Sequence, residues 1–368
     1  MPIRPPLPSP RCTLVLLGFL LLAACTPTAS LIDCQPVGTM VPHCGFTNPE
    51  DLAPLDGGRM IVVSEMGDLL EDGAKGHLSL FDTQRQERRE LATSIDSAGE
   101  RWGDPQCPPP TRLNPHGIDI VQRSDGRILL LVVNHGDREA VEFFEILADD
   151  ESWTAAWRGC AIPPGAPFLN DVTALPDGGF AATQFWERDS PMIEVGARLL
   201  VGADTGWVWA WSPKDGFRRV PGSDAALPNG IASSADGRFL FVDQYFEDRV
   251  VRLDRTTGEI DGSFEMRQPD NVVVAEDGSL WVAGHHQFVG DFSCTDIEGA
   301  CPWQYSVARI DPATMEGEIL FTHEGPPMGF ATVALPVGDR LYLGSAAGDR
   351  IVSMPRPMPA QSGTTPTR

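Results

Sequence analysis

Six short turns made of Asp and Gly recur along this chain, and each stands just before a run of apolar residues that favour β-structure. Gly and Asp tolerate the positive φ angles of a tight hairpin, so each turn predicts two antiparallel strands. A mainly helical fold is excluded, because no long window shows a 3.6-residue apolar repeat and Gly and Pro occur throughout. The aspartates of the six turns are Asp56, Asp125, Asp177, Asp236, Asp277 and Asp339.

The uneven spacing of these turns fits four-stranded units whose outer loops vary in length. Six such units predict an all-β fold, a six-bladed β-propeller with four-stranded blades around a central channel. The sixth unit lacks an outer strand after Ile351-Val352, and we expect residues 37–46 to supply it. The predicted organisation is a lipoprotein signal peptide at 1–24, a lipid tether and ring-closing segment at 25–45, the propeller at 46–354 and a disordered tail at 355–368.

The N-terminal residues predict export and lipidation. A short positively charged start precedes an apolar run over residues 14–24, which is too short to span a bilayer comfortably and is typical of a signal peptide. The run ends in Leu22-Ala23-Ala24-Cys25, the pattern of a bacterial lipobox, although an ordinary signal peptide with a chance cysteine would look similar. We expect the only membrane association to be a lipid on Cys25, with the protein facing the periplasm. Thr26 after the cysteine favours the outer membrane.

Apart from Cys12 and Cys25, six cysteines remain, an even number that suits disulfide formation in an oxidising compartment. Local pairing would join Cys34 with Cys44 and Cys294 with Cys301, and would leave Cys107 for Cys160, but the spacing does not decide between the possible pairings. The formal net charge of −23 argues against nucleic-acid binding and against attraction to anionic lipid. Solubility explains most of the acidic residues, and some are available as oxygen ligands for a hard cation.

Polar residues stand shortly before the turn in five of the six repeats, where the innermost strand of a blade is expected to begin. Circular symmetry would bring all of them together on the propeller axis, and calcium binds such carboxylate and amide oxygens. Asn229 taken alone would more often belong to a turn, because Gly230 follows it, whereas turn chemistry explains the other asparagines less well. These residues are Glu50, His116, Asn170, Asn229 and the pair Asp270-Asn271.

Two histidines accompany this set. His116 stands ahead of one expected strand and His135 at the end of the next, so a hairpin between them would bring the imidazoles together. Such a pair provides a base near neutral pH and a partner that fixes its tautomer, although a single histidine would more often be structural. No G-x-S-x-G, H-E-x-x-H, P-loop or G-x-G-x-x-G pattern occurs.

Several of these stretches resemble the paraoxonase/arylesterase family of calcium-dependent propeller esterases and lactonases. The resemblance runs in order over about residues 44 to 350, and the His-Gly, Val-Asn-His and Asn-Asp stretches are specific only in combination. The similar stretches are Glu50-Asp51-Leu52, Leu113-Asn114-Pro115-His116-Gly117-Ile118, Leu131-Val132-Val133-Asn134-His135, Val141-Glu142-Phe143-Phe144, Leu169-Asn170-Asp171-Val172, Asn229-Gly230-Ile231 and Asp270-Asn271-Val272.

The resemblance implies two calcium ions (Ca2+), one catalytic and one structural. The catalytic ion would polarise the carbonyl of a small ester or lactone, and His116, supported by His135, would activate water. His285 matches a histidine at the rim of the substrate pocket, and Leu227 occupies a pocket position where the family often has an aromatic residue. The implied ligands are Glu50, Asn170, Asn229, Asp270 and Asn271 for the catalytic ion, and Asp51, Asp171 and the carbonyl of Ile118 for the structural ion.

The chain also departs from the family. Animal members join their two ends by a disulfide, but no cysteine follows Cys301 here, and residues 287–303 resemble a different lid. We expect a monomer, and the choice of substrate does not transfer from the family. Two alternatives stay open, a gluconolactonase-like hydrolase of sugar lactones and a non-catalytic propeller lipoprotein that binds a partner and holds calcium for structure alone.

Overall fold

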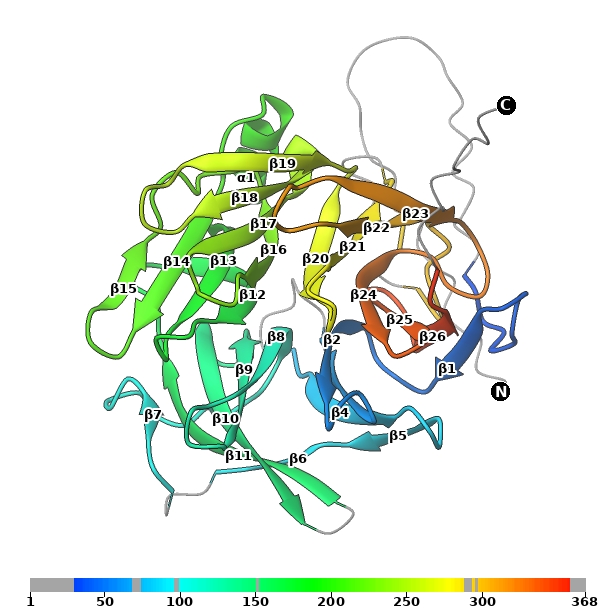
Figure 1. Cartoon of the computed structure of the whole chain (residues 1–368), viewed down its shortest axis with the longest axis horizontal. Coiled ribbons are helices and arrows are strands. Elements are labelled where there is room, and N and C mark those ends of the chain that lie inside the picture. Colours follow the sequence, from blue (N-terminus) through cyan, green and yellow to red (C-terminus); the bar gives the residue numbers. More distant parts are fainter. Residues whose placement is uncertain are drawn as a thin grey trace, which may run out of the picture.

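Six antiparallel sheets stand around a central axis in this computed structural model, and the chain passes through them in order (Figure 1). The structure describes residues 30–67, 74–95, 99–149, 152–287, 293–294 and 297–357. The predicted signal peptide, Cys25, the end of the predicted tail and much of the predicted lid lie outside these residues. The fold prediction, a six-bladed propeller with four-stranded blades, is confirmed.

Each blade is counted from its innermost strand outward. Blade 1 consists of β2 (Pro49–Leu55), β3 (Met60–Glu65), β4 (His77–Asp82) and β5 (Glu87–Glu90). Blade 2 consists of β8 (Pro115–Gln122), β9 (Ile128–Asn134), β10 (Ala140–Asp149) and β11 (Ser152–Ala161). Blade 3 consists of β12 (Pro167–Ala174), β13 (Phe180–Glu187), β14 (Trp207–Ser212) and β15 (Gly216–Arg219).

The second half of the ring repeats the pattern. Blade 4 consists of β16 (Pro228–Ser233), β17 (Phe239–Gln244), β18 (Arg249–Asp254) and β19 (Ile260–Glu265). Blade 5 consists of β20 (Pro269–Val274), β21 (Leu280–His285), β22 (Tyr305–Ile310) and β23 (Gly317–His323). Blade 6 consists of β24 (Ala331–Val337), β25 (Arg340–Ser345), β26 (Arg350–Pro355) and β1 (Val41–Cys44).

The structure also contains short strands and helices outside the four-stranded blades, which were not predicted from the sequence. Two short strands pair in parallel with the outer strand of blade 2, which makes that sheet six-stranded. They are β6 (Ala92–Ser94) and β7 (Trp102–Gly103). A helix, α1 (Met192–Leu200), lies between β13 and β14, and a short 3-10 turn, η1 (Tyr245–Glu247), follows β17. No helix within the described residues is long and apolar enough to cross a membrane.

The Asp-Gly turns form hairpins because the aspartate side chain holds the turn. Asp277 Oδ1 accepts the backbone N–H of Ser279 at 3.1 Å, and the Asp125, Asp177 and Asp236 turns repeat this bond two residues on. Gly278, between Asp277 and Ser279, has a φ of 80°, a conformation that glycine adopts without strain. The Asp-Gly turns from which the repeat was predicted are therefore the features that end one strand and begin the next.

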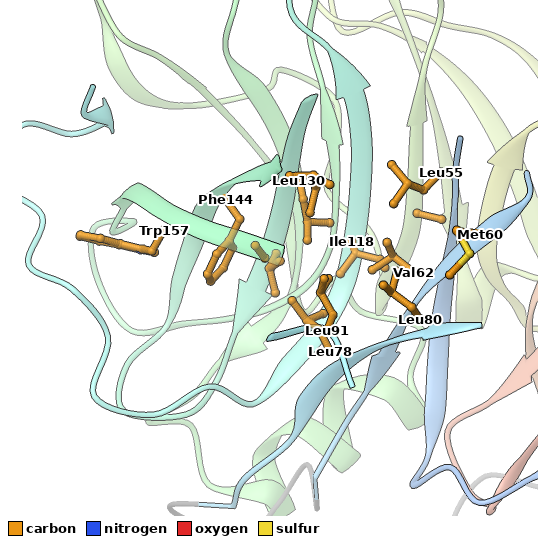
Figure 2. Packing of buried hydrophobic residues seen from close by; sticks show 14 of the residues in the cluster. Leu55, Met60, Val62, Leu78, Leu80, Leu91, Ile118, Leu130, Phe144 and Trp157 are labelled. Carbon is orange, nitrogen blue, oxygen red and sulfur yellow. The ribbon is translucent and has the colours of Figure 1, made fainter. Parts of the chain in front are cut away.

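Apolar side chains fill the spaces between neighbouring blades. Along β9, Leu130 and Val132 pack towards blade 1, while Leu131 and Val133 pack towards blade 3, because side chains alternate along a strand. Figure 2 shows the cluster between blades 1 and 2, from Leu55 to Trp157. Five more clusters occupy the other junctions. A strand packed on both faces accounts for the continuous apolar run that follows each turn in the sequence.

Both ends of the chain build blade 6. β1 pairs antiparallel with β26, from Val41 opposite Ser353 to Cys44 opposite Arg350. The buried Arg350 guanidinium also donates to the carbonyl oxygens of Leu31 and Asp33, each at 2.7 Å. The ring thus closes by backbone hydrogen bonds. Within the described residues the disulfides are Cys34–Cys44, Cys107–Cys160 and Cys294–Cys301, and none of them joins β1 to β26.

Candidate metal centre and histidine pair

The innermost strand of every blade loses its regular register at the same place. The irregularity falls at the predicted site residues in five blades and at Thr332 in the sixth. A bulge of this kind redirects side chains and is common beside active sites. Here the bulge removes the polar residues from the regular pairing of the inner strand, at the channel. The shifts lie between Pro49 and Asp51, Pro115 and Ile118, Leu169 and Val172, Pro228 and Ile231, Pro269 and Val272, and Ala331 and Val333.

The five residues implied as ligands of a catalytic ion come together, and we call them the channel cluster: Glu50, Asn170, Asn229, Asp270 and Asn271. Asn271 Nδ2 donates to Glu50 Oε1 at 2.7 Å. His116 Nε2 lies 3.8 Å from the same Glu50 oxygen and 3.3 Å from Asn170 Nδ2. Gly230, the residue after Asn229, packs against the backbone of Asp270, because a Cβ atom placed on Gly230 would lie 2.3 Å from the Asp270 carbonyl oxygen. All five side chains are buried.

Three oxygens of the channel cluster have no hydrogen-bond partner, namely Glu50 Oε2, Asn170 Oδ1 and Asn229 Oδ1. A buried acceptor without a donor costs about 1–3 kcal/mol, so three in one cluster indicate a missing positive partner. Carboxylate and amide oxygens are the donors that calcium prefers, so the residues fit this ion. Within the described residues, no group of three or more His, Cys, Asp or Glu side chains could hold a metal by itself, so the asparagines are essential to the fit.

The electrostatics agree with this fit. Burial raises the pKa of Glu50 well above its ordinary value, and the nearby carboxylates of Asp51 and Asp270 raise it further. Burial also raises the pKa of Asp270 well above normal, and that of Asp51 to about 7. A divalent cation among these groups would reverse the shifts, because opposite charge favours the ionised form.

The residues implied for a structural ion link neighbouring blades. Asp51 Oδ2 accepts the N–H of Ile118 at 2.8 Å, and Asp171 Oδ2 accepts the N–H of Ile231 at 2.8 Å. Their other oxygens accept the N–H groups of Leu52 and Val172 at 2.7 Å. Each oxygen keeps a lone pair, so both carboxylates remain able to bind a cation while they connect blade 1 to blade 2 and blade 3 to blade 4.

The two histidines are in contact and belong to a longer chain of hydrogen bonds. His116 Nδ1 lies 2.9 Å from His135 Nε2, and His135 Nδ1 lies 2.9 Å from both carboxylate oxygens of Glu139. Arg188 binds the same carboxylate. Reasoning from the sequence missed Glu139, although its place four residues after His135, in the β9–β10 connection, was an available signal.

The hydrogen-bonded chain of His116, His135 and Glu139 determines which nitrogen of each imidazole carries a hydrogen. A carboxylate only accepts, so His135 Nδ1 carries a hydrogen towards Glu139, and Nε2 of the neutral ring accepts from His116 Nδ1–H. His116 Nε2 is then left with its lone pair, beside Glu50 and Asn170. Burial lowers the pKa of His116 well below its ordinary value, which keeps that lone pair free at neutral pH.

The two predicted pocket residues lie on opposite sides of Tyr245. His285 is buried in the channel wall, with Nε2 at 3.2 Å from Asp270 Oδ2, Nδ1 at 3.1 Å from the Tyr245 hydroxyl, and its ring stacked on Phe330. Leu227 is half-buried with a φ of 57°, and its carbonyl accepts the N–H of Tyr245 at 3.2 Å. The structure therefore places His285 at the cluster itself and Leu227 two residues before Asn229.

A separate cavity of about 310 Å³ lies at the outer side of blade 3, between α1, Trp186, Trp207 and Arg219. None of the predicted site residues lines it. Because the predicted ligands and the histidine pair lie at the channel and not in this cavity, the chemistry is assigned to the channel.

A six-bladed propeller with an oxygen-rich channel and a buried histidine pair defines the class of lactonase- and esterase-type propeller hydrolases. The chain belongs to one family within that class, described as Arylesterase, whose model matches residues 71–348. The family resemblance read from the sequence is thereby confirmed.

Individual similarities are weaker than the family match. A curated relative, Mechanosensory abnormality protein 6 of Caenorhabditis elegans, is 27% identical over 181 residues, which are 46% of this chain and 45% of that protein. The chain thus matches less than half the length of this relative. A solved gluconolactonase, XC5397 from Xanthomonas campestris, superposes with a TM-score of 0.51 over 86% of this chain and 89% of that chain. At 17% identity this likeness shows the fold alone.

Proposed function

We propose that the protein is a calcium-dependent hydrolase of small esters or lactones, with its reaction centre in the propeller channel. One observation carries the proposal, namely that three unpartnered oxygens converge at one buried place with the unprotonated Nε2 of His116, which accepts a hydrogen bond from Asn170 Nδ2 at 3.3 Å. Membership of the arylesterase family supports the same class of reaction.

The channel cluster would hold the ion, and two of its members, Glu50 and Asp270, carry the formal negative charge. Bound calcium would supply Lewis acidity to the substrate carbonyl oxygen, where negative charge develops. Asn271 restrains Glu50 by its hydrogen bond, and His285, which contacts the Tyr245 hydroxyl, lies with Nε2 at 3.2 Å from Asp270 Oδ2. These contacts preorganise the donors before substrate enters.

The histidine chain would provide the base. His116 Nε2 removes a proton from water, the water oxygen forms a bond to the carbonyl carbon, and the alkoxide leaves with the proton that His116 returns. During this cycle His135 receives the hydrogen bond of His116 Nδ1, and the Glu139 carboxylate stabilises the positive charge on the pair. Hydrolysis of a lactone follows the same steps, with the leaving alkoxide retained in the product.

The remaining predictions complete this proposal. A structural ion would be bound by Asp51, Asp171 and the carbonyl of Ile118, whose carboxylates keep lone pairs for it. Lipid on Cys25 would hold the protein at the periplasmic face of a bacterial membrane, as a monomer. A variant with Cys25→Ser, produced without the signal peptide, would then be soluble and suitable for assay.

The test is turnover of that variant on aryl esters, aliphatic lactones and gluconolactone, measured with calcium, with chelator and after calcium is restored. Loss with chelator and recovery with calcium on aryl esters or aliphatic lactones supports the proposal. Turnover confined to gluconolactone favours the sugar-lactone alternative. A folded protein that binds calcium but turns over no substrate contradicts the hydrolase proposal and favours the partner-binding propeller.

A further inference from the structure

A buried acid that belongs neither to the channel cluster nor to the histidine chain lies beside them. Asp243, near the end of β17 in blade 4, is fully buried, and neither of its carboxylate oxygens has a hydrogen-bond partner. It faces the irregular segment of β16, since the strand pairing passes from Pro228–Gln244 to Ile231–Val242. No hydrogen-bond donor among the described residues compensates for this carboxylate.

Comparison of the six blades shows that the acid is particular to blade 4. The equivalent position is the residue just before the partner of the last inner-strand residue ahead of the bulge, and in the other blades this residue is small or uncharged. The six residues are Ser64, Val133, Thr183, Asp243, Ala283 and Gly344. Packing at this position therefore does not require a carboxylate.

Thr183 shows what the position contacts. In blade 3 its hydroxyl accepts the N–H of Asp171 at 3.0 Å and donates to the carbonyl of Asn229 at 2.5 Å. The position thus lies between the inner strand of its own blade and the ligand residue of the next blade. For Asp243, the corresponding residue of the next blade is Asp270, and β16 and β20 are indeed neighbours around the axis (Figure 1).

Gly230 leaves open the space in which these groups meet. A Cβ atom placed on Gly230 would lie 2.8 Å from Asp243 Oδ2 and 2.3 Å from the carbonyl oxygen of Asp270. Both oxygens therefore face the same small volume, which any larger residue would fill. Burial, followed by the charges of Asp270 and Asp171, raises the pKa of Asp243 well above normal, in agreement with this proximity.

We propose that Asp243 is an additional cation ligand of the channel, a third carboxylate that binds the ion held by the channel cluster together with the carbonyl oxygen of Asp270. The inference rests on the proposed function, since it concerns the same ion. Glu50 and Asp270 carry two negative charges, and Asp243 brings the total to three. More charged ligands mean tighter binding of a hard cation, so this chain is adapted to hold calcium at low concentration.

The experiment is calorimetric titration of calcium into the metal-free protein, with metal content measured independently. Two variants remove the charge, Asp243→Asn and Asp243→Thr, and the second copies the residue that blade 3 accommodates at this position. The control is Asp82→Asn, which removes another buried charge, in β4, whose carboxylate accepts the N–H of Gln84 at 3.0 Å. We expect calcium affinity to fall about tenfold or more in both Asp243 variants and about twofold or less in the control.

The outcomes separate this inference from the proposed function. A wild-type protein that binds no calcium contradicts both. Calcium-dependent turnover in wild type with unchanged affinity in both Asp243 variants overturns the inference alone, because Asp243 would then act as a hydrogen-bonding group that Asn or Thr replaces. If Asp243→Asn does not fold, the titration of Asp243→Thr decides, and a Thr variant with wild-type affinity also overturns the inference.

Discussion

Asn271 Nδ2 donates a hydrogen bond of 2.7 Å to Glu50 Oε1, which joins the innermost strand of blade 5 to that of blade 1 across the channel. The two residues are 221 positions apart in the chain. Blade 6 stands between their blades, so this bond is made at the axis rather than within a blade junction. The channel cluster is therefore assembled only when the whole ring has closed.

Replacement of Asn271 by Ala is expected to weaken calcium binding. The change removes one oxygen donor and releases Glu50, and because loss of an orienting group alone costs about 10- to 100-fold, affinity should fall at least about tenfold. Titration with calcium measures the effect, and activity at saturating calcium provides the control. Wild-type affinity in a folded Asn271→Ala protein would show that Asn271 does not act on the ion.

The His116→Gln variant should distinguish the contribution of the base from that of the metal ion. Because Gln keeps polarity but cannot take up a proton, kcat should fall by about 10²- to 10⁴-fold, while calcium affinity stays within about twofold of wild type. Steady-state kinetics and calcium titration on the same preparation provide both values. If the variant retains wild-type kcat on every substrate, water is activated by another group.

Glu139→Gln tests the positioning role of the outermost member of the histidine chain. Loss of the carboxylate charge should destabilise the protonated form of His116 and move the acidic limb of the kcat profile to lower pH. It should also reduce kcat by about 10- to 100-fold with little change in KM. The matched control is Glu187→Gln, which changes an acid on β13 that does not belong to the hydrogen-bonded chain of His116, His135 and Glu139. An unshifted profile in Glu139→Gln would contradict the role.

The metal-free protein should lose stability as pH rises from about 5 to 8. Burial raises the pKa of Asp51 to about 7 and those of Glu50, Asp171 and Asp270 well above normal, so the folded state holds more protons than the unfolded state in this range. Stability is then full below the unfolded pKa and is lost as pH rises through the folded pKa. Thermal unfolding in chelator should show a Tm lower by about 5 °C or more at pH 8 than at pH 5.5. Calcium should remove this dependence, and a Tm in chelator that rises with pH would contradict it.

The disulfide beside the ring closure should contribute more than the one in the β21–β22 connection. Cys34–Cys44 restrains the segment that supplies β1, whereas Cys294–Cys301 closes a local loop. Replacing Cys34 and Cys44 by Ser should lower the free energy of unfolding by about 2–4 kcal/mol, and the double variant at Cys294 and Cys301 should lower it less. Denaturant unfolding of both variants decides the order, and equal losses would contradict it.

The fold could be predicted because its information is local. The Asp-Gly turn carries its own hydrogen bond, as Asp277 with Ser279 shows, and it recurs once in each blade. The channel positions could be located for the same reason, because each stands six to nine residues ahead of a turn. The circular symmetry of the six blades then predicted that these positions, far apart in the sequence, come together at the axis.

Glu139, Asp243 and α1 could not be predicted in this way. Glu139 acts through a loop contact with His135, and Asp243 is one acid among many until the register shift in β16 places it at the channel. The helix α1 lies in the connection between β13 and β14, and the repeated sequence pattern does not specify the structure of that connection. Features that break the repeat are visible only in three dimensions.

The pairing of β1 with β26 also sets the order in which the molecule can be made. The residues that form β1 are synthesised before those of blades 1 to 5, yet their partner strand ends at Pro355. Until Arg350–Pro355 has emerged, the growing chain carries unpaired strand edges, which are prone to associate with other chains. The ring can therefore be finished only after β26 has been produced, and a product truncated before β26 would have no partner for β1.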